Sequence, residues 1–167
     1  PPAIGTPPAR YPGAATTARS LFEDVDSEGK DPELDDIDSS TDVDIRESDS
    51  TIIRLANHII EEAHRERASD IHVEPCSLSK QTVIRFRVDG QCFEYQKVAL
   101  SIARPLVTRF KIMASLDISE RRRPQDGKIR TRLSGREIEL RVSTIPSVRG
   151  NEDLVLRLLA PEDLIPI

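Results

Sequence analysis

The chain has 167 residues, of which 37% are hydrophobic and 32% charged, and its formal net charge is −5. This length suits one domain of ordinary size plus a tail, and no apolar run approaches the roughly 18–20 residues that cross a bilayer. Two Cys and three His are too few and too badly spaced for a zinc site. Because no signal peptide is recognised in the sequence, we expect Cys76 and Cys92 to be reduced thiols in the cytosol.

The charge is divided between two parts of the chain. Residues 1–50 carry 4 basic and 13 acidic side chains, whereas residues 51–167 carry 20 basic and 16 acidic ones. The first part is rich in Pro and Ala and then in Asp, Glu and Ser, which leaves too little apolar surface to offset the entropy of ordering. We therefore predict a disordered tail over residues 1–48; alternatively, its scattered aliphatic side chains dock on a basic partner.

A helix and a polar strand are predicted at the start of the folded part. A helix cap at Asp49 precedes apolar residues at helical spacing, which predicts an amphipathic helix that ends near Ala68. The period then changes to two over residues 70–75, and we interpret this segment as an edge strand. The polar residues of that strand share one face: Asp70, His72 and Glu74.

This polar face leaves more than one function open. A hydrolase with His72 as its general base would also need a nucleophile held by that His, and strand alternation places Ser69 on the opposite side. We favour a face that is hydrogen-bonded or meets a neighbouring domain, with catalysis or metal ligation at His72 as the remaining hypotheses.

The rest of the chain predicts an antiparallel sheet interrupted by one helix. A β-hairpin over residues 82–97 turns at Asp89-Gly90, and a second amphipathic helix covers residues 100–114. A charged loop at 121–127 precedes the remaining strands, which are 128–133, 137–143 and 154–159. This order predicts an α+β domain over residues 49–160, with a mostly antiparallel sheet and two packed helices.

Two groups of arginines are candidate binding residues. Arg85 and Arg87 lie two positions apart on a strand, so both guanidinium groups project from one face and can embrace a phosphate or carboxylate. The alternative is a solvated face that pairs with Glu94 or other carboxylates. A denser positive cluster runs from the charged loop to Lys128 and suits a phosphate, a nucleic acid or an acidic protein face. Its cations are Arg121, Arg122, Arg123 and Lys128, and Arg130 and Arg132 follow on alternate positions. With four Phe, two Tyr and no Trp, the chain has few side chains for stacking bases, which argues against single-stranded nucleic acid.

Several motifs together carry a family resemblance. In chain order they are Ala-Ser-Asp-Ile-His-Val-Glu-Pro at 68–75, Arg-Phe-Arg-Val-Asp-Gly at 85–90, the long block 109–128 with its Glu-Arg-Arg-Arg-Pro-Gln-Asp-Gly-Lys ending, and the closing strands 140–146 and 155–159. Over residues 50–160 the chain resembles the PAS-like second amino-terminal domain of the type II secretion and type IV pilus assembly ATPases. It departs from the family in a turn at 150–153 that is one residue longer, and in an acidic tail where many members have a folded first domain.

The resemblance implies a non-catalytic module of a hexameric motor, which couples ATP hydrolysis in an adjoining core to domain movement and protein or pilin transport. It implies that Arg85 and Arg87 face the nucleotide or the core. It also implies that Arg109, the cluster 121–123 and Asp126 lie at domain or subunit interfaces. The competing hypothesis is a stand-alone basic module that binds a nucleotide such as a cyclic dinucleotide, with the loop arginines as its phosphate clamp.

The resemblance also implies partners and cofactors. The expected partners are the protein's own ATPase core, neighbouring subunits of the hexamer and the inner-membrane platform protein, which would place the chain in the cytoplasm, peripherally attached to the bacterial inner membrane. No Gly-x-x-x-x-Gly-Lys-Ser/Thr phosphate loop occurs in the 167 residues, so we expect no cofactor on this chain and ATP and Mg²⁺ on the core. The Pro-Pro start is typical of an excised fragment, and we expect residues 161–167 to begin a linker to that core.

Overall fold

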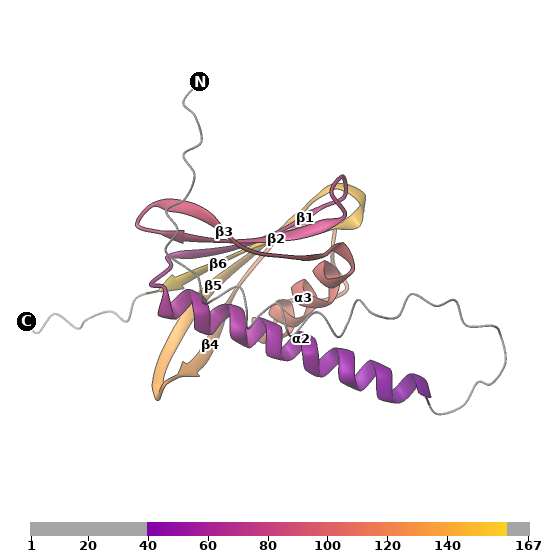
Figure 1. Cartoon of the computed structure of the whole chain (residues 1–167), viewed down its shortest axis with the longest axis horizontal. Helices are drawn as coiled ribbons and strands as arrows, with labels where there is room; N and C mark the ends of the chain where they lie inside the picture. The colour runs from indigo at the N-terminus through magenta and orange to yellow at the C-terminus, as the bar shows by residue number, and fades with distance from the viewer. Residues whose placement is uncertain (1–39, 160–167) are drawn as a thin grey trace, which may run out of the picture. The chain divides into compact units, whose positions relative to one another are not determined.

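The computed structural model describes the backbone of residues 40–159 and the side chains of residues 49–159 (Figure 1). A compact unit begins at Asp49. The described elements, in chain order, are α2 (Ser40–Arg65), β1 (Asp70–Cys76), β2 (Gln81–Val88), β3 (Gln91–Ala99), α3 (Leu100–Met113), β4 (Gln125–Leu133), β5 (Arg136–Pro146), the 3-10 turn η1 (Val148–Gly150) and β6 (Glu152–Leu159). The predicted α+β class, with two helices and an antiparallel sheet, is confirmed. Of the tail predicted over residues 1–48, residues 1–39 lie outside the described residues, as does the linker at 161–167.

The strands form one six-stranded sheet in the order β3-β2-β1-β6-β5-β4, and every neighbouring pair is antiparallel. Each half of the sheet is a meander of consecutive strands, and the pairing of β1 with β6 joins the halves. The prediction that residues 70–75 form an edge strand is therefore wrong. β1 is an interior strand, because β6, which lies far along the chain, supplies its second hydrogen-bonded neighbour.

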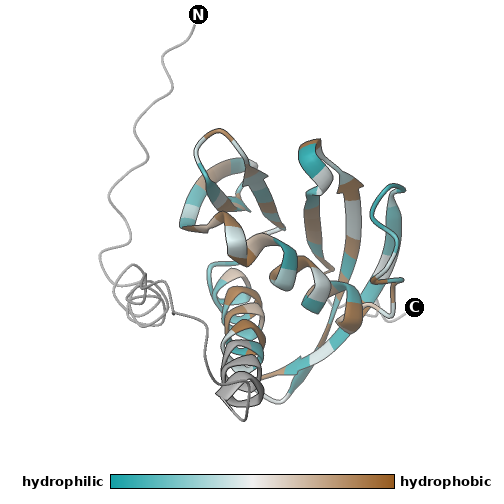
Figure 2. Ribbon diagram, turned by 90° about the vertical axis from the view of Figure 1, so that its right-hand side faces the viewer, coloured by the Kyte–Doolittle hydropathy of each residue, from teal (hydrophilic) through white to brown (hydrophobic). Residues whose placement is uncertain are grey.

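One face of the sheet is apolar and packs against helices. Hydrophobic and hydrophilic residues follow one another along the strands (Figure 2), and burial alternates along most of them. Many of the side chains on the apolar face are fully shielded from solvent. They include Ile71, Val73, Ile84, Phe86, Leu140, Val142, Leu154 and Leu156. The buried stripe of α3 contributes Leu106 and Phe110 to the same core, and burying such side chains contributes roughly 1.5–3 kcal/mol each. Within the described residues, no helix combines the length and apolar composition needed to cross a bilayer.

The turns follow the predicted chemistry. Asp89 and Gly90 adopt φ angles of 51° and 77°, and Ser134 and Gly135 adopt 49° and 77°. Positive φ at both central positions is the requirement of a type I′ hairpin turn, which Asp-Gly and similar pairs meet at least cost. The hairpin predicted at Asp89-Gly90 is confirmed.

Two predicted boundaries differ from the structure. The first helix begins at Ser40 rather than near Asp49, because a helix that is already nucleated gains one hydrogen bond for each residue added. β4 begins at Gln125, so the last part of the predicted loop is a strand. There the backbone at Gly127 passes close to the end of α3: a Cβ at Gly127 would lie 2.8 Å from Leu116 Cδ2 and 3.0 Å from the carbonyl oxygen of Ala114.

A buried ion pair fixes α3 against the start of β6. Lys111 Nζ lies 2.6 Å from Glu152 Oε1, and the two side chains are only 1% and 7% exposed. The same ammonium donates a hydrogen bond of 2.6 Å to the carbonyl oxygen of Glu120, in the segment between α3 and β4. A buried charge is tolerated when it is paired and hydrogen-bonded. This contact therefore ties the helix, the following loop and β6 to one point.

Removing one partner of this pair should cost far more than removing both. We expect Lys111→Met to lower the free energy of unfolding by about 3–5 kcal/mol, because it leaves Glu152 as a buried unpaired carboxylate. The double variant Lys111→Met/Glu152→Leu should recover most of the loss. Urea titration followed by circular dichroism measures both values.

The matched control is Lys97→Met, which removes a half-exposed ion pair with Glu94 and should leave the free energy of unfolding nearly unchanged. Equal losses in Lys111→Met and Lys97→Met would contradict a structural role for the buried pair.

Candidate functional site

The second face of the sheet has no helix of the described residues over it and is strongly charged. The strand pairings place one residue of each strand side by side across this face, in a row that crosses the whole sheet. In sheet order the members of this cross-strand row are Cys92, Arg87, Asp70, Arg157, Arg141 and Lys128. The row therefore contains four cations and one carboxylate.

Asp70 is the anchor of the row. Its Oδ1 accepts a 3.0 Å hydrogen bond from Arg157 Nε, and its Oδ2 accepts one of 2.8 Å from the Ser69 hydroxyl. Burial alone would raise the pKa of this carboxyl, but the hydrogen bonds from Ser69 and Arg157 and the charges of Arg157 and Arg87 outweigh it. The pKa of Asp70 is therefore lowered below its ordinary value. The Arg157 side chain remains 63% exposed although its Nε is held, so part of its guanidinium stays available to a ligand.

On the side of Arg157 away from Asp70, two further cations, Arg141 and Lys128, lie directly opposite each other on neighbouring strands. Arg141 is paired in register with Arg157 on one side and with Lys128 on the other, and it forms no ion pair within residues 49–159. Lys128 Nζ lies 2.8 Å from Glu139 Oε1, and Arg130 uses the other oxygen of that carboxylate. Like charges directly opposite each other destabilise a sheet. An anion on this face would relieve that repulsion.

Arg85 and Arg87 project from this same face, as predicted from their spacing. Arg85 Nε lies 3.3 Å from Glu74 Oε2, which matches the alternative of a carboxylate-paired strand face. Arg87 Nε donates to Cys92 Sγ at 3.5 Å, and this hydrogen bond together with the negative charge of Asp70 raises the pKa of Arg87. Of the two predicted nucleotide-facing arginines, Arg87 is the one that belongs to the cross-strand row.

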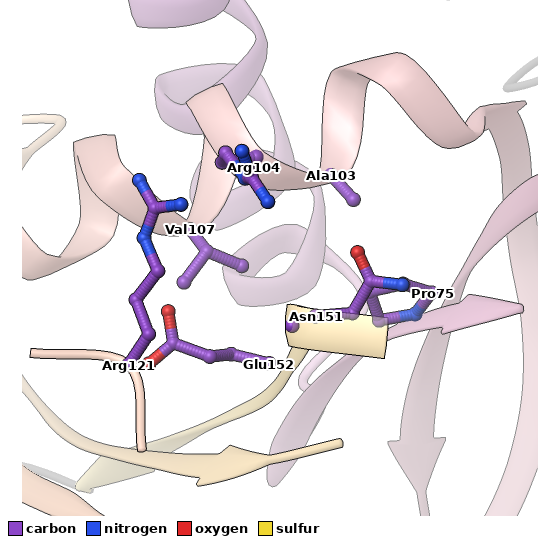
Figure 3. A pocket seen from close by; sticks show the side chains of 8 residues that line it. Pro75, Ala103, Arg104, Val107, Arg121, Asn151 and Glu152 are labelled. Atoms are coloured by element: carbon purple, nitrogen blue, oxygen red, sulfur yellow. The ribbon is translucent and has the colours of Figure 1, made fainter. Parts of the chain in front are cut away.

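The predicted interface residues do not gather at one place. Asp126 lies on the charged sheet face, where it accepts a hydrogen bond from the Ser143 hydroxyl. Arg109 is on α3 and is half-buried, and its Nε has no hydrogen-bond partner among the described residues. Arg121 lines a narrow cleft together with Arg104 (Figure 3). The remaining two arginines of the loop, Arg122 and Arg123, are exposed to solvent.

The hypothesis of catalysis at His72 finds no partner in the structure. The Ser69 hydroxyl donates to Asp70 and to the carbonyl oxygen of Arg87, and His72 Nε2 is buried without a hydrogen-bond partner among the described residues. A nucleophile and its base are therefore not brought together. Within residues 49–159, no three His, Cys, Asp or Glu side chains lie close enough to hold a metal ion.

A cleft borders the charged face next to Glu74, between β1, β2 and the start of β6. Burial, and secondarily the charge of Glu74, raises the pKa of Asp153 in this cleft. Hydrogen bonds from the side chain and backbone of Ser79, and from the backbone of Leu78, lower the pKa of the Cys76 thiol. The carboxylates of this cleft make it a poor extension of a phosphate site.

Sequence reasoning placed Lys128 in the positive cluster but missed the central cations of the row, Arg141 and Arg157. Period-two alternation already placed each of them on a polar strand face. What it could not show is the pairing register of the three consecutive strands β4, β5 and β6, which places these cations directly beside one another.

Comparisons with known proteins agree on one family. The family model described as "Type II/IV secretion system protein" matches residues 46–165. "Type II secretion system protein E" of Pseudomonas aeruginosa is 46% identical over 152 residues, which cover 90% of this chain and 30% of that protein. "Type II secretion system ATPase E" of Vibrio cholerae is 42% identical over 151 residues, covering 89% of this chain and 29% of that protein. The chain thus spans about three-tenths of the length of these relatives.

A solved structure also matches, with much lower sequence identity. The X-ray structure of the Legionella pneumophila ATPase DotB is 14% identical, with a TM-score of 0.47 over 65% of this chain and 29% of that one.

The Asp70 contacts predict how stability depends on pH. Because the pKa of the folded Asp70 carboxyl is lowered, its contribution to stability is fully present above its ordinary pKa of 3.8. The contribution is lost as the pH falls through the lower value of the folded state. We expect Asp70→Asn to reduce the free energy of unfolding at pH 6, and this difference from the wild type should narrow at pH 3.

Urea titrations at the two pH values measure this difference. Asp89→Asn, at the exposed hairpin turn, is the control, because Asp89 has no ion pair within residues 49–159. A pH-independent effect of Asp70→Asn would show that its charge does not contribute.

Proposed function

The chain belongs to the type II/IV secretion system protein family, and we propose that it is the non-catalytic, nucleotide-sensing module of a secretion ATPase. In this proposal an adjoining core binds ATP and Mg²⁺ and performs hydrolysis. The charged sheet face supplies cations to the phosphates from outside that core. The module works within a hexamer at the cytoplasmic face of the inner membrane, where the platform protein receives its movement.

The observation that carries this proposal is the row of neighbouring cations at Arg157, Arg141 and Lys128. Arginine forks bind phosphate oxygens through paired hydrogen bonds, and two adjacent forks suit a polyphosphate. Asp70 holds the Nε of Arg157 and so orients the rest of its guanidinium. Because the Asp70 carboxylate is already bound to Arg157, we assign the coordination of Mg²⁺ to groups outside this face.

Coupling follows from the charge that these cations meet. Hydrolysis and release of the terminal phosphate reduce the negative charge near the sheet face, so the face then binds the nucleotide site less tightly. A ligand shifts a conformational equilibrium by its difference in affinity for the two states. A change in phosphate charge can therefore move the whole domain relative to the core, which is the step that would transmit work to partners.

The test uses a protein that joins this chain to a phosphate-loop core in one polypeptide. We expect Arg141→Ala and Arg157→Ala each to lower kcat for ATP hydrolysis by at least about tenfold, since each removes a cation at developing phosphate charge. Arg130→Ala is the matched control on the same face. Arg130 is occupied by Glu139, so its loss should leave kcat within about twofold of the wild type.

The isolated chain provides the second arm of the test. It should hydrolyse no ATP and show no measurable affinity for nucleotides in calorimetric titration. Tight binding of a cyclic dinucleotide to the isolated chain, abolished by Arg122→Ala, would contradict the proposal and support a stand-alone binding module. Wild-type kcat in both Arg141→Ala and Arg157→Ala would remove the sheet face from the nucleotide site.

A further inference from the structure

Two exposed aliphatic side chains stand at neighbouring turns at one end of the sheet. Leu78, in the turn between β1 and β2, is 94% exposed, and Val148, the first residue of η1, is 67% exposed. These are the most exposed large hydrophobic side chains of residues 49–159. Asn151 Nδ2 donates to Ser77 Oγ across 3.4 Å, which links the two turns, and Figure 1 shows them side by side beyond the ends of their strands.

Cations flank both aliphatic tips. Lys80 follows Leu78 by two positions and Arg149 follows Val148 directly, and the two cations line one cleft together with Asn151 and the first turn of α3. Neither Lys80 nor Arg149 belongs to an ion pair within residues 49–159. This end of the domain therefore presents charge that the described residues do not neutralise.

Further positive charge adjoins the same turns. Arg104 Nη2 lies 3.9 Å from the position that a Cβ on Gly150 would take, and Arg121 lines the cleft next to it (Figure 3). Neither takes part in an ion pair of the described residues. The first turn of α3 carries no acidic residue and no side-chain cap, so its backbone dipole adds to the positive potential.

We propose that this end of the domain docks on a membrane surface rich in anionic phospholipids. Leu78 and Val148 enter the boundary between headgroups and acyl chains, and Lys80 and Arg149 contact lipid phosphates beside them. Long basic side chains can keep an apolar stem near the acyl chains while the charge stays at the headgroups, and anionic lipids attract basic segments near the surface.

The shape of the surface favours a lipid over an acidic protein. A stable protein interface covers about 800 Å² on each partner and has a contiguous apolar core. Here the apolar side chains are single residues at separate turn tips, each with a flexible cation close by. Such an arrangement suits the fluid interfacial region of a bilayer. The surface shares no residue with the cross-strand row, so this inference stands independently of the proposed nucleotide contact.

Vesicle flotation with the complete 167-residue chain tests the proposal. We expect it to float with vesicles of phosphatidylethanolamine containing about one-third phosphatidylglycerol, and to bind pure phosphatidylcholine vesicles at least about tenfold less tightly. Leu78→Ser/Val148→Ser and Lys80→Glu/Arg149→Glu should each weaken binding to the anionic vesicles by at least about fivefold. All these residues are exposed, and circular dichroism checks that each variant is folded.

The matched control is Ile112→Ser/Arg132→Glu, which removes an exposed aliphatic side chain and reverses a cation elsewhere on the domain; it should bind like the wild type. Failure of the wild type to float with anionic vesicles would overturn the proposal. Loss of binding in Lys80→Glu/Arg149→Glu with unchanged binding in Leu78→Ser/Val148→Ser would also overturn it. That result would show a purely ionic surface without lipid insertion, as an acidic protein or nucleic-acid partner would use.

Discussion

The pairing of β1 with β6 is the constraint on which the rest of this domain depends. It joins two local meanders into one sheet over a short register, from Asp70 opposite Arg157 to Val73 opposite Leu154, and the amide of Leu158 extends it by donating to the carbonyl oxygen of Ser69. Contacts so far apart in sequence carry a loop-closure cost before they stabilise anything. Specific side-chain contacts on both faces of the sheet accompany this junction.

Those contacts differ according to the face. On the helix-covered face, Lys111 and Glu152 form a buried pair that leaves no charge free. On the open face, Asp70 holds Arg157 through one nitrogen while most of that side chain stays in solvent. The first arrangement specifies how α3 meets the sheet. The Asp70–Arg157 contact orients the Arg157 guanidinium but leaves the neighbouring cations of the cross-strand row in place. A surface that keeps such a positive charge can bind an external anion.

Much of the fold could be predicted from local pattern. The amphipathic period of the two helices, the Asp89-Gly90 turn and the alternation along each strand depend on residues that are neighbours in sequence, and the structure confirms them. Of the candidate site, the shared orientation of Arg85 and Arg87 followed from the same alternation. The adjacency of Arg141 and Arg157 at the centre of the cross-strand row could not be predicted. Alternation assigns a side chain to one face of the sheet, but it does not say which residues of other strands lie beside it.

By itself the sequence indicated where the helices and strands lie, apart from the starts of α2 and β4. It also indicated which side of each strand is polar and which family motifs the chain carries. Only the tertiary structure decided that β1 is an interior strand and that Asp70 meets Arg157, 87 positions later. It also brought Leu78 and Val148 to adjacent turns. The reason is physical: backbone geometry and local periodicity act over a few residues. Strand order is set by the burial of one common apolar face, to which every strand contributes.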